Sequence, residues 1–208
     1  MAHRLYNRFE IELDQEACVA HMGTSNLSYG QAYVSILRSL FSYTGKKILG
    51  DQDSLAWTKI PAFLSMCPNG KVIAIIRDPR DVVTSFKQMT IAPGNDYLIS
   101  LFNVVDLANH AFRYRAQYPD RVHVVRFERL KTHTEEELRS LSTFLEIDYS
   151  PKMIEGANFT DHAGNLWDAQ GHLTFQDETE WLAPVGRWQR GIESEDLFLC
   201  EWIAGKQI

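Results

Sequence analysis

The sequence contains few cysteines. Three occur in 208 residues, at Cys18, Cys67 and Cys200, and no two of them form a C-x-x-C pair. An odd, widely spaced set argues against a disulfide framework and against a zinc site. We therefore expect no bound metal and a reducing, cytoplasmic setting.

Long hydrophobic runs and an excess of positive charge are also missing. No apolar stretch approaches the length of a membrane-spanning helix, and the first residues lack a signal-peptide pattern. The formal net charge is −6, so non-specific binding to nucleic acid is not expected. Any anionic ligand must instead be held by a local cluster of arginines.

Strand-like and helix-like segments alternate along the chain. Helices are expected at 29–45, 54–67, 78–89, 95–119, 132–147 and 195–208, and strands at 46–49, 71–76 and 121–127. This alternation predicts a single α/β domain over residues 1–208 with a mainly parallel sheet. Residues 149–185 are rich in loop-forming residues.

Local signals predict several boundaries of these elements. Asp78 is a good N-cap, and Pro79 suits the first position of the helix that follows. Thr134 and Glu137 have the spacing of a capping box. Pro61 is expected to bend its helix.

Arg77 stands at the end of the apolar run 71–76, which predicts a strand covered on both faces. Ligands of open α/β sheets bind beyond the carboxyl ends of the strands. Ser85 follows two helical turns after Asp78, so a guanidinium fork and a hydroxyl are expected to converge on one phosphate. The alternative is that Arg77 pairs with Asp78 or Asp81 and that Ser85 has no function.

The segment KVIAIIRDPRDVVTSF resembles the 3′-phosphate-binding motif of sulfotransferases that use 3′-phosphoadenosine 5′-phosphosulfate (PAPS). In that family a strand is followed by R-D/N-P-x-D-x-x-x-S on a helix. The segments VHVVRFERL, LRSLSTFLEI and PVGRWQRGI resemble further blocks of the family in the same order, so the resemblance covers most of the chain. It implies a three-layer sulfotransferase fold related to P-loop NTPases, with PAPS as the sulfate donor.

The resemblance also implies nucleotide-binding residues. Arg77 and Ser85 match the pair that binds the 3′-phosphate, and Phe127 stands where the family often has a tyrosine near the adenine. A late loop that closes over the nucleotide is matched by Gly186, Arg187, Trp188 and Arg190. Core packing is the alternative role for Phe127, and Trp188 is expected to anchor the last helix as well.

The glycine-rich loop that cradles the 5′-phosphosulfate in this family has no counterpart in the sequence. Gly45 and Gly50 have the spacing of a P-loop, but Asp51 and Gln52 follow, which also argues against a P-loop kinase. We therefore expect an N-terminally incomplete version of the fold. Segment 8–13, a partner chain or a rearranged sheet would then cover the strand edges that the missing strand leaves open.

The activity implied by the resemblance is transfer of a sulfuryl group from PAPS to a hydroxyl or amine of a small-molecule or carbohydrate acceptor. Gln52 stands where the family often has a lysine that neutralises this group in flight. No general base is identified. Glu10 and Glu12 lie in the segment where acceptor-side acids often occur in this family, and His110, His123 and His162 are alternatives without positional support.

A second function remains open, namely a non-catalytic relative that binds PAPS, its product 3′-phosphoadenosine 5′-phosphate (PAP), or a protein partner. The missing loop and Gln52 favour this alternative, whereas Arg77, Ser85 and the late loop favour an enzyme. Residues 167–181 are expected to shape the acceptor pocket. A homo-oligomer is an open alternative to a monomer.

Overall fold

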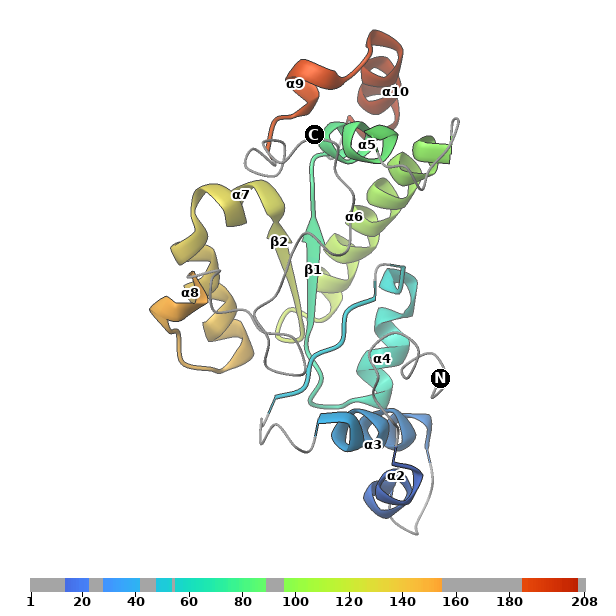
Figure 1. The fold of residues 1–208 in the computed structure, drawn as a ribbon, viewed down its shortest axis with the longest axis vertical. Coiled ribbons are helices and arrows are strands. Elements are labelled where there is room, and N and C mark those ends of the chain that lie inside the picture. The colour runs from blue at the N-terminus through green and yellow to red at the C-terminus, as the bar shows by residue number, and fades with distance from the viewer. Residues whose placement is uncertain are drawn as a thin grey trace. The chain divides into compact units, whose positions relative to one another are not determined.

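A computed structural model describes residues 14–22, 28–41, 48–53, 55–88, 96–154 and 185–205. Internal contacts divide the chain into two compact units, Met1–Gly70 and Lys71–Ile208, and each is described by itself (Figure 1). The single domain over residues 1–208 stays a prediction. Several sequence predictions lie outside the described residues: segment 8–13 with Glu10 and Glu12, Gly45, His162 and the loop 167–181.

The first unit contains the helices α2 (Gln15–Met22), α3 (Tyr29–Phe41) and α4 (Ile60–Met66), with a 3-10 turn, η2 (Trp57–Lys59), before α4. The helix predicted from residue 29 is confirmed. It begins with a capping box that the sequence analysis missed: Gln31 donates its backbone N–H to Ser28 Oγ at 3.2 Å, and Ser28 donates its own to Gln31 Oε1 at 2.9 Å. The S-x-x-Q spacing was the available signal.

Two predictions for this unit are wrong. Ile48 and Leu49, expected in a strand, have irregular backbone. Pro61 does not bend a helix, because α4 begins at Ile60 and the proline stands in its first turn. A proline in the first turn interrupts no helical hydrogen bond, since the N–H that it lacks would have no partner there.

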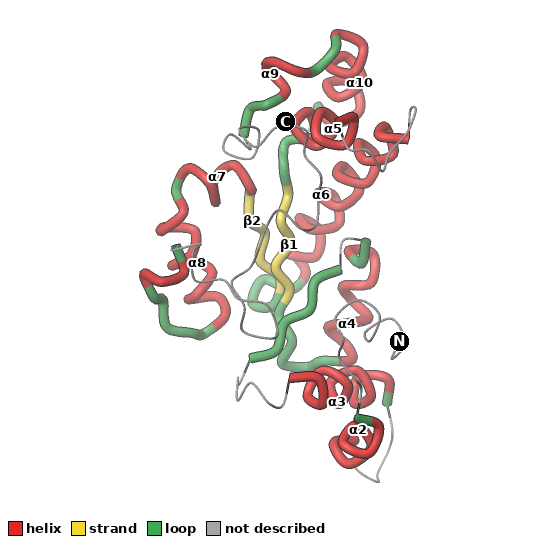
Figure 2. The backbone as a smooth tube through the Cα atoms, viewed as in Figure 1, coloured by secondary structure: helices red, strands yellow, loops and turns green. Residues whose placement is uncertain are grey.

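The second unit is built on two parallel strands, β1 (Val72–Ile76) and β2 (Val122–Arg126), paired in register from Val72 with Val122 to Ile76 with Arg126 (Figure 2). Parallel neighbours need a long crossover. It consists here of α5 (Pro79–Gln88), a 3-10 turn, η3 (Asp96–Leu98), and α6 (Ile99–Gln117). The predicted α/β fold with parallel strands is confirmed.

Helix α6 covers one face of the two strands. Ala74 and Ile76 of β1 pack on Ala108 and Ala111 of this helix, and the small alanines let the helix approach closely. On the other face, the ring of His123 lies 5.0 Å from that of Phe144, which belongs to α8 (Thr134–Leu145). Helices therefore lie on both sides of β2 (Figure 1).

The prediction that the run 71–76 is covered on both faces is wrong. Ile73 and Ile75 of β1 are 38% and 50% exposed. Helix α8 reaches β2 but leaves this side of β1 open, and within the described residues β1 pairs with β2 alone. An N-terminally incomplete fold is expected to leave a strand edge open. The second edge of β1 has no strand partner in the part of the chain that the structure describes.

The helix α7 (Phe127–Thr132) follows β2 directly, and α8 comes next. The predicted capping box of α8 is wrong, since His133 is the N-cap and makes no side-chain cap bond. Glu137 pairs instead with Arg129 of α7. At the other end Glu146 adopts a left-handed conformation, with φ 58°, which turns the chain out of the helix.

The last described elements are α9 (Trp188–Gly191) and α10 (Ser194–Ala204). Helix α10 packs on α5 and α6 through a second apolar cluster, made by Val83, Tyr97, Leu101, Cys200 and Ala204. The chain segment 185–191 lies at the start of α5. Gly186 of this segment donates a hydrogen bond to Asp81, which is 105 residues earlier in the sequence.

Candidate functional site

The loop from β1 to α5 is fixed by side chains on both sides of Asp78. Asp78 caps α5 as predicted, since its Oδ1 accepts the backbone N–H of Arg80 at 2.9 Å. Its Oδ2 also accepts Arg80 Nη2 at 2.7 Å. From α7, Glu128 Oε1 accepts the backbone N–H of Asp78 at 2.8 Å. These bonds set the direction in which the chain leaves β1.

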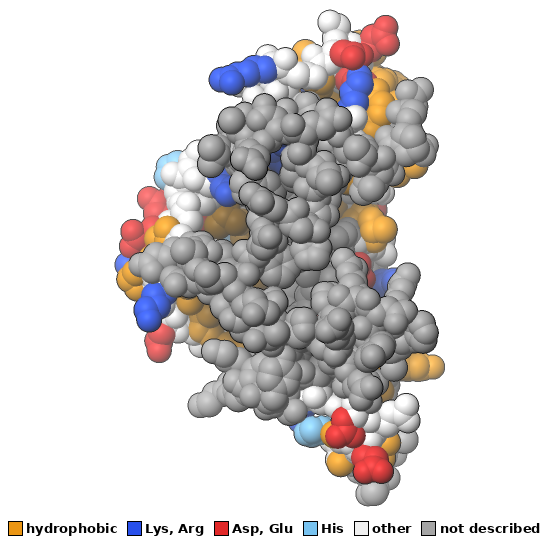
Figure 3. Space-filling model, in the orientation of Figure 1, with side chains coloured by type: hydrophobic (Ala, Val, Ile, Leu, Met, Phe, Trp, Pro, Cys, Tyr) orange, Lys and Arg blue, Asp and Glu red, His pale blue; other side chains and the backbone are white. Residues whose placement is uncertain are grey.

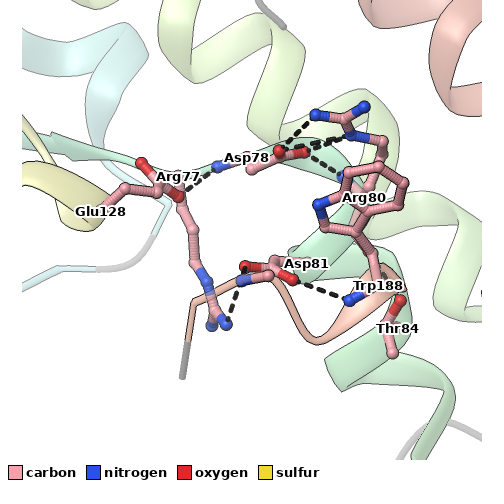
Figure 4. A network of polar contacts seen from close by, with 8 residues as sticks. Arg77, Asp78, Arg80, Asp81, Thr84, Glu128 and Trp188 are labelled. Carbon is pink, nitrogen blue, oxygen red and sulfur yellow. Dashed lines mark hydrogen bonds and ion pairs between the residues drawn. The ribbon is translucent and has the colours of Figure 1, made fainter. Parts of the chain in front are cut away.

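Arg77 extends from this loop toward Asp81 (Figure 4). Its Nη2 lies 3.8 Å from Asp81 Oδ2, and its side chain is 21% exposed. The guanidinium also lies over the ring of Phe127, 4.8 Å from the centroid, a cation–π geometry. The alternative that Arg77 pairs with Asp81 is thus present as an ion pair of 3.8 Å. Asp78, the other partner considered, pairs with Arg80.

Asp81 connects α5 to the late loop. Its side chain is almost completely buried, and it accepts the backbone N–H of Gly186 on Oδ2 at 2.8 Å and that of Trp188 on Oδ1 at 3.0 Å. Gly186 has φ +75°, a backbone conformation that residues with a Cβ rarely adopt. From the sequence alone, Asp81 is expected only as a partner of Arg77.

A second contact holds the same loop. The guanidinium of Arg80 lies 3.8 Å from the centre of the Trp188 ring, while Asp78 fixes the other side of that guanidinium (Figure 4). The N-terminal turn of α5 therefore binds the late loop in two ways. Asp81 accepts backbone N–H groups of the loop, and Arg80 stacks on the indole ring of Trp188. Trp188 thus anchors the late loop on α5, while its predicted role in anchoring the last helix stays a prediction.

Arg187 lies between the two anchored residues and adds a second cation near Arg77. Burial lowers the pKa of Arg77 from its ordinary value, Asp81 opposes this effect, and the charge of Arg187 lowers the pKa further. Two guanidinium groups that repel each other in a partly buried place favour an anion between them. On the face drawn in Figure 3, by contrast, basic and acidic side chains are interspersed among the described residues.

Two predicted nucleotide-binding residues, Ser85 and Arg190, remain to be placed. Ser85 is half-buried in α5, one helical turn beyond Asp81 and on the same face. Arg190 is exposed in α9, and its side chain forms no ion pair with another described residue. The structure thus brings together Arg77, Phe127 and the 186–188 segment, while the convergence of Ser85 on the same ligand remains a prediction.

Neither described histidine among the general-base candidates lies in this cluster. His110 Nδ1 is 2.9 Å from the Asp106 carbonyl oxygen within α6. His123 packs on Phe144, and burial lowers its pKa, with a further contribution from Arg115. In the residues that the structure describes, no cluster of His, Cys, Asp or Glu suits a metal ion. None of the helices in this described part has the length and hydropathy of a membrane span.

Comparison with known proteins agrees with the resemblance seen in the motifs. Residues 3–151 match the model of a family described as the sulfotransferase family. Among solved structures, the chain is similar to a sulfotransferase domain from the curacin biosynthetic pathway, with a TM-score of 0.58 and 20% sequence identity over 88% of this chain and 68% of that one. Comparison with curated proteins gave no significant match.

Proposed function

The chain belongs to the sulfotransferase family, and we propose that it binds the 3′-phosphate of PAPS between Arg77 and Arg187 and transfers the sulfuryl group to a hydroxyl or amine acceptor. Family and fold support sulfotransfer in general. The observation that carries the nucleotide proposal is the shared anchor at Asp81, which lies beside Arg77 and fixes the loop that carries Arg187.

The cluster supplies what a phosphate dianion requires. Arg77 offers a planar donor fork at the carboxyl end of β1, where ligands of parallel sheets bind. Phe127 holds this guanidinium from one side, so little side-chain entropy is lost when the ligand arrives. Arg187 adds the second charge, and Ser85 is proposed to donate its hydroxyl from the same face of α5.

The transfer step depends on charge stabilisation around the sulfur. An acceptor oxygen or nitrogen attacks in line, its proton passes to a base, and PAP leaves with the electrons of the broken S–O bond. Gln52 stands where the family often has a lysine that neutralises the sulfuryl group. Loss of one preorganised donor typically costs about 3–4 kcal/mol of barrier.

This deficit favours a second candidate function, a relative that binds PAP or PAPS without turnover. Both candidates require the Arg77 cluster, and they differ in whether the bound donor reacts. Titration of PAP by calorimetry, together with an assay of PAP release from PAPS on the same sample, separates them. Binding with turnover supports the enzyme, and binding without turnover supports the non-catalytic module.

The cluster itself is tested with Arg77→Ala and Arg77→Lys. We expect the alanine variant to bind PAP at least about tenfold more weakly, because a charge-assisted hydrogen bond contributes roughly 1.5–3 kcal/mol. The lysine variant should recover part of the loss, because it keeps the charge without the fork. Arg115→Ala, an exposed arginine of α6, is the matched control. Unchanged PAP affinity in Arg77→Ala would overturn the proposal.

A further inference from the structure

A cavity of about 330 Å³ lies at the carboxyl ends of β1 and β2, bounded by these strand ends, α6 and α7. Ile76 and Arg126 are register partners at the two strand ends and line it together. Side chains alternate along a strand, and Ile76 packs toward α6, so Arg126 extends on the α6 side as well. Arg77 also lines the cavity, but its guanidinium lies over the ring of Phe127 and near Asp81.

One wall of the cavity is apolar. It is formed by Ile76, Pro79, Val104 and Ala108, and all four of these side chains are buried. They are held by the packing of α6 on β1 and do not need to rearrange to receive a ligand. A pocket that is largely preformed and mostly apolar, with a few polar groups, is the usual form of a small-molecule site.

The opposite wall carries charged groups, most of which are already engaged. The two carboxylates are occupied, since Asp78 binds Arg80 and Glu128 accepts the Asp78 backbone N–H. Arg129 is paired with Glu136 and Glu137.

Arg126 differs from these groups. It is exposed, and within the described part of the chain its guanidinium has neither an ion pair nor a hydrogen bond. The charge that the cavity offers to a ligand is therefore positive, and it comes from a planar donor fork suited to carboxylate, sulfate or phosphate oxygens.

We propose that this cavity is a binding site for a small organic anion, with its apolar body against Val104 and Ala108 and its anionic group on Arg126. The site lies on the α6 side of the strands and adjoins Arg77. Because the Arg77 guanidinium is directed at Phe127 and Asp81, an anion on Arg126 and PAPS at Arg77 would use different charged groups. It takes an apolar molecule with a single acidic group, because one unengaged guanidinium faces an apolar wall.

The proposal is tested with three probes that separate charge from apolar surface. The protein of residues 1–208 is titrated by calorimetry with 4-nitrophenyl sulfate, inorganic sulfate and 4-nitroanisole. We expect the aryl sulfate to bind at least about tenfold more tightly than either part alone, since apolar contact and a charge-assisted bond both contribute. In methyl NMR spectra, the resonances of Val104 and Ala108 should shift on addition of the aryl sulfate.

Arg126→Ala should weaken binding of 4-nitrophenyl sulfate about tenfold, and Arg126→Lys should recover part of it. Arg115→Ala again serves as the control, and PAP affinity should stay within about twofold in all three variants. Equal aryl sulfate affinity in Arg126→Ala, or methyl shifts elsewhere in the protein, would overturn the site. Loss of PAP binding in Arg126→Ala would show that the cavity belongs to the nucleotide site and would overturn its independence.

Discussion

The buried carboxylate of Asp81 accepts the backbone N–H of Gly186 at 2.8 Å, 105 residues further along the chain. The second oxygen accepts the N–H of Trp188. One aspartate in the first turn of α5 thus determines where the 186–188 loop lies, and with it the position of Arg187. The positive φ of Gly186 lets two N–H groups separated by one residue point at the same carboxylate.

Replacement of Asp81 by Asn should affect phosphate binding in two opposite ways, through the lost negative charge and through the position of the 186–188 loop. Asp81 is an anion 3.8 Å from Arg77, so removing its charge would tighten binding if electrostatics alone mattered. An amide, however, offers one acceptor oxygen to two N–H groups. We expect loss of the loop position to dominate, with PAP affinity reduced about tenfold in a calorimetric titration.

Asp120→Asn, at an exposed turn, is the control for the change in net charge. Amide hydrogen exchange at Gly186 and Trp188 should speed up in Asp81→Asn and not in Asp120→Asn. Tighter PAP binding in the Asp81 variant would mean that this residue opposes the ligand and does not position the loop.

The stacking of Arg80 on Trp188 predicts a graded series. Trp188→Phe keeps an aromatic face for the guanidinium, while Trp188→Ala removes it. We expect the alanine variant to lose about 1 kcal/mol of local stability in the loop and the phenylalanine variant less. Exchange protection of residues 185–191 measures this loss, and equal protection in both variants would contradict a cation–π contribution.

Asp196 is expected to matter for stability, because it joins three elements in the second apolar cluster. It is 4% exposed and accepts Lys87 Nζ at 2.9 Å and Tyr97 Oη at 2.8 Å. Asp196→Asn should lower the free energy of unfolding by about 2 kcal/mol, because it weakens a buried charge-assisted network. Glu193→Gln removes the exposed partner of Lys87 and should cost about 0.5 kcal/mol or less. Urea denaturation measures both.

The same network gives a pH dependence. The hydrogen bond to Asp196 raises the pKa of Lys87 above its ordinary 10.5, and burial followed by Asp196 raises that of Tyr97 above 10.0. Stability that comes from a raised pKa is present below the unfolded-state pKa and is lost as the pH rises through the folded-state value. Unfolding free energies should therefore fall above about pH 10, and less steeply in Asp196→Asn. An equal alkaline decline in both proteins would contradict this assignment.

The cysteines are expected to differ in reactivity. Cys200 is fully buried, and burial raises its pKa to about 11, so at pH 8 roughly one thiol in a thousand is ionised. Cys67 is half-buried. Iodoacetamide at pH 8 should modify Cys67 first and leave Cys200 intact until denaturant is added, as read by peptide mass spectrometry. Rapid native labelling of Cys200 would indicate that α10 opens locally.

Sequence periodicity located α5, α6, α8 and α10 of the second unit well, because their apolar faces are complete within single segments. The short helices α7 and α9 were not predicted, and Phe127, expected at the end of a strand, begins α7. The strands β1 and β2 were equally visible as β-branched runs. Errors arose where a boundary depends on a competing partner. Thr134 and Glu137 have the spacing of a capping box, but Arg129 from the preceding helix takes the Glu137 carboxylate. Exposure of Ile73 and Ile75 was not predictable, since the covering of a strand face depends on distant segments.

The sequence by itself determined the family, the strand that ends just before Arg77 and the cap at Asp78, because each is encoded within a few neighbouring residues. Only the tertiary structure decided what the arginines and aspartates do. It placed Asp81 under a loop more than one hundred residues away, assigned Arg80 to Trp188, and left Arg126 in a cavity without an acidic partner among the described residues. Charged side chains of the same type are indistinguishable in a sequence, and their roles depend on which distant segments the fold brings within reach.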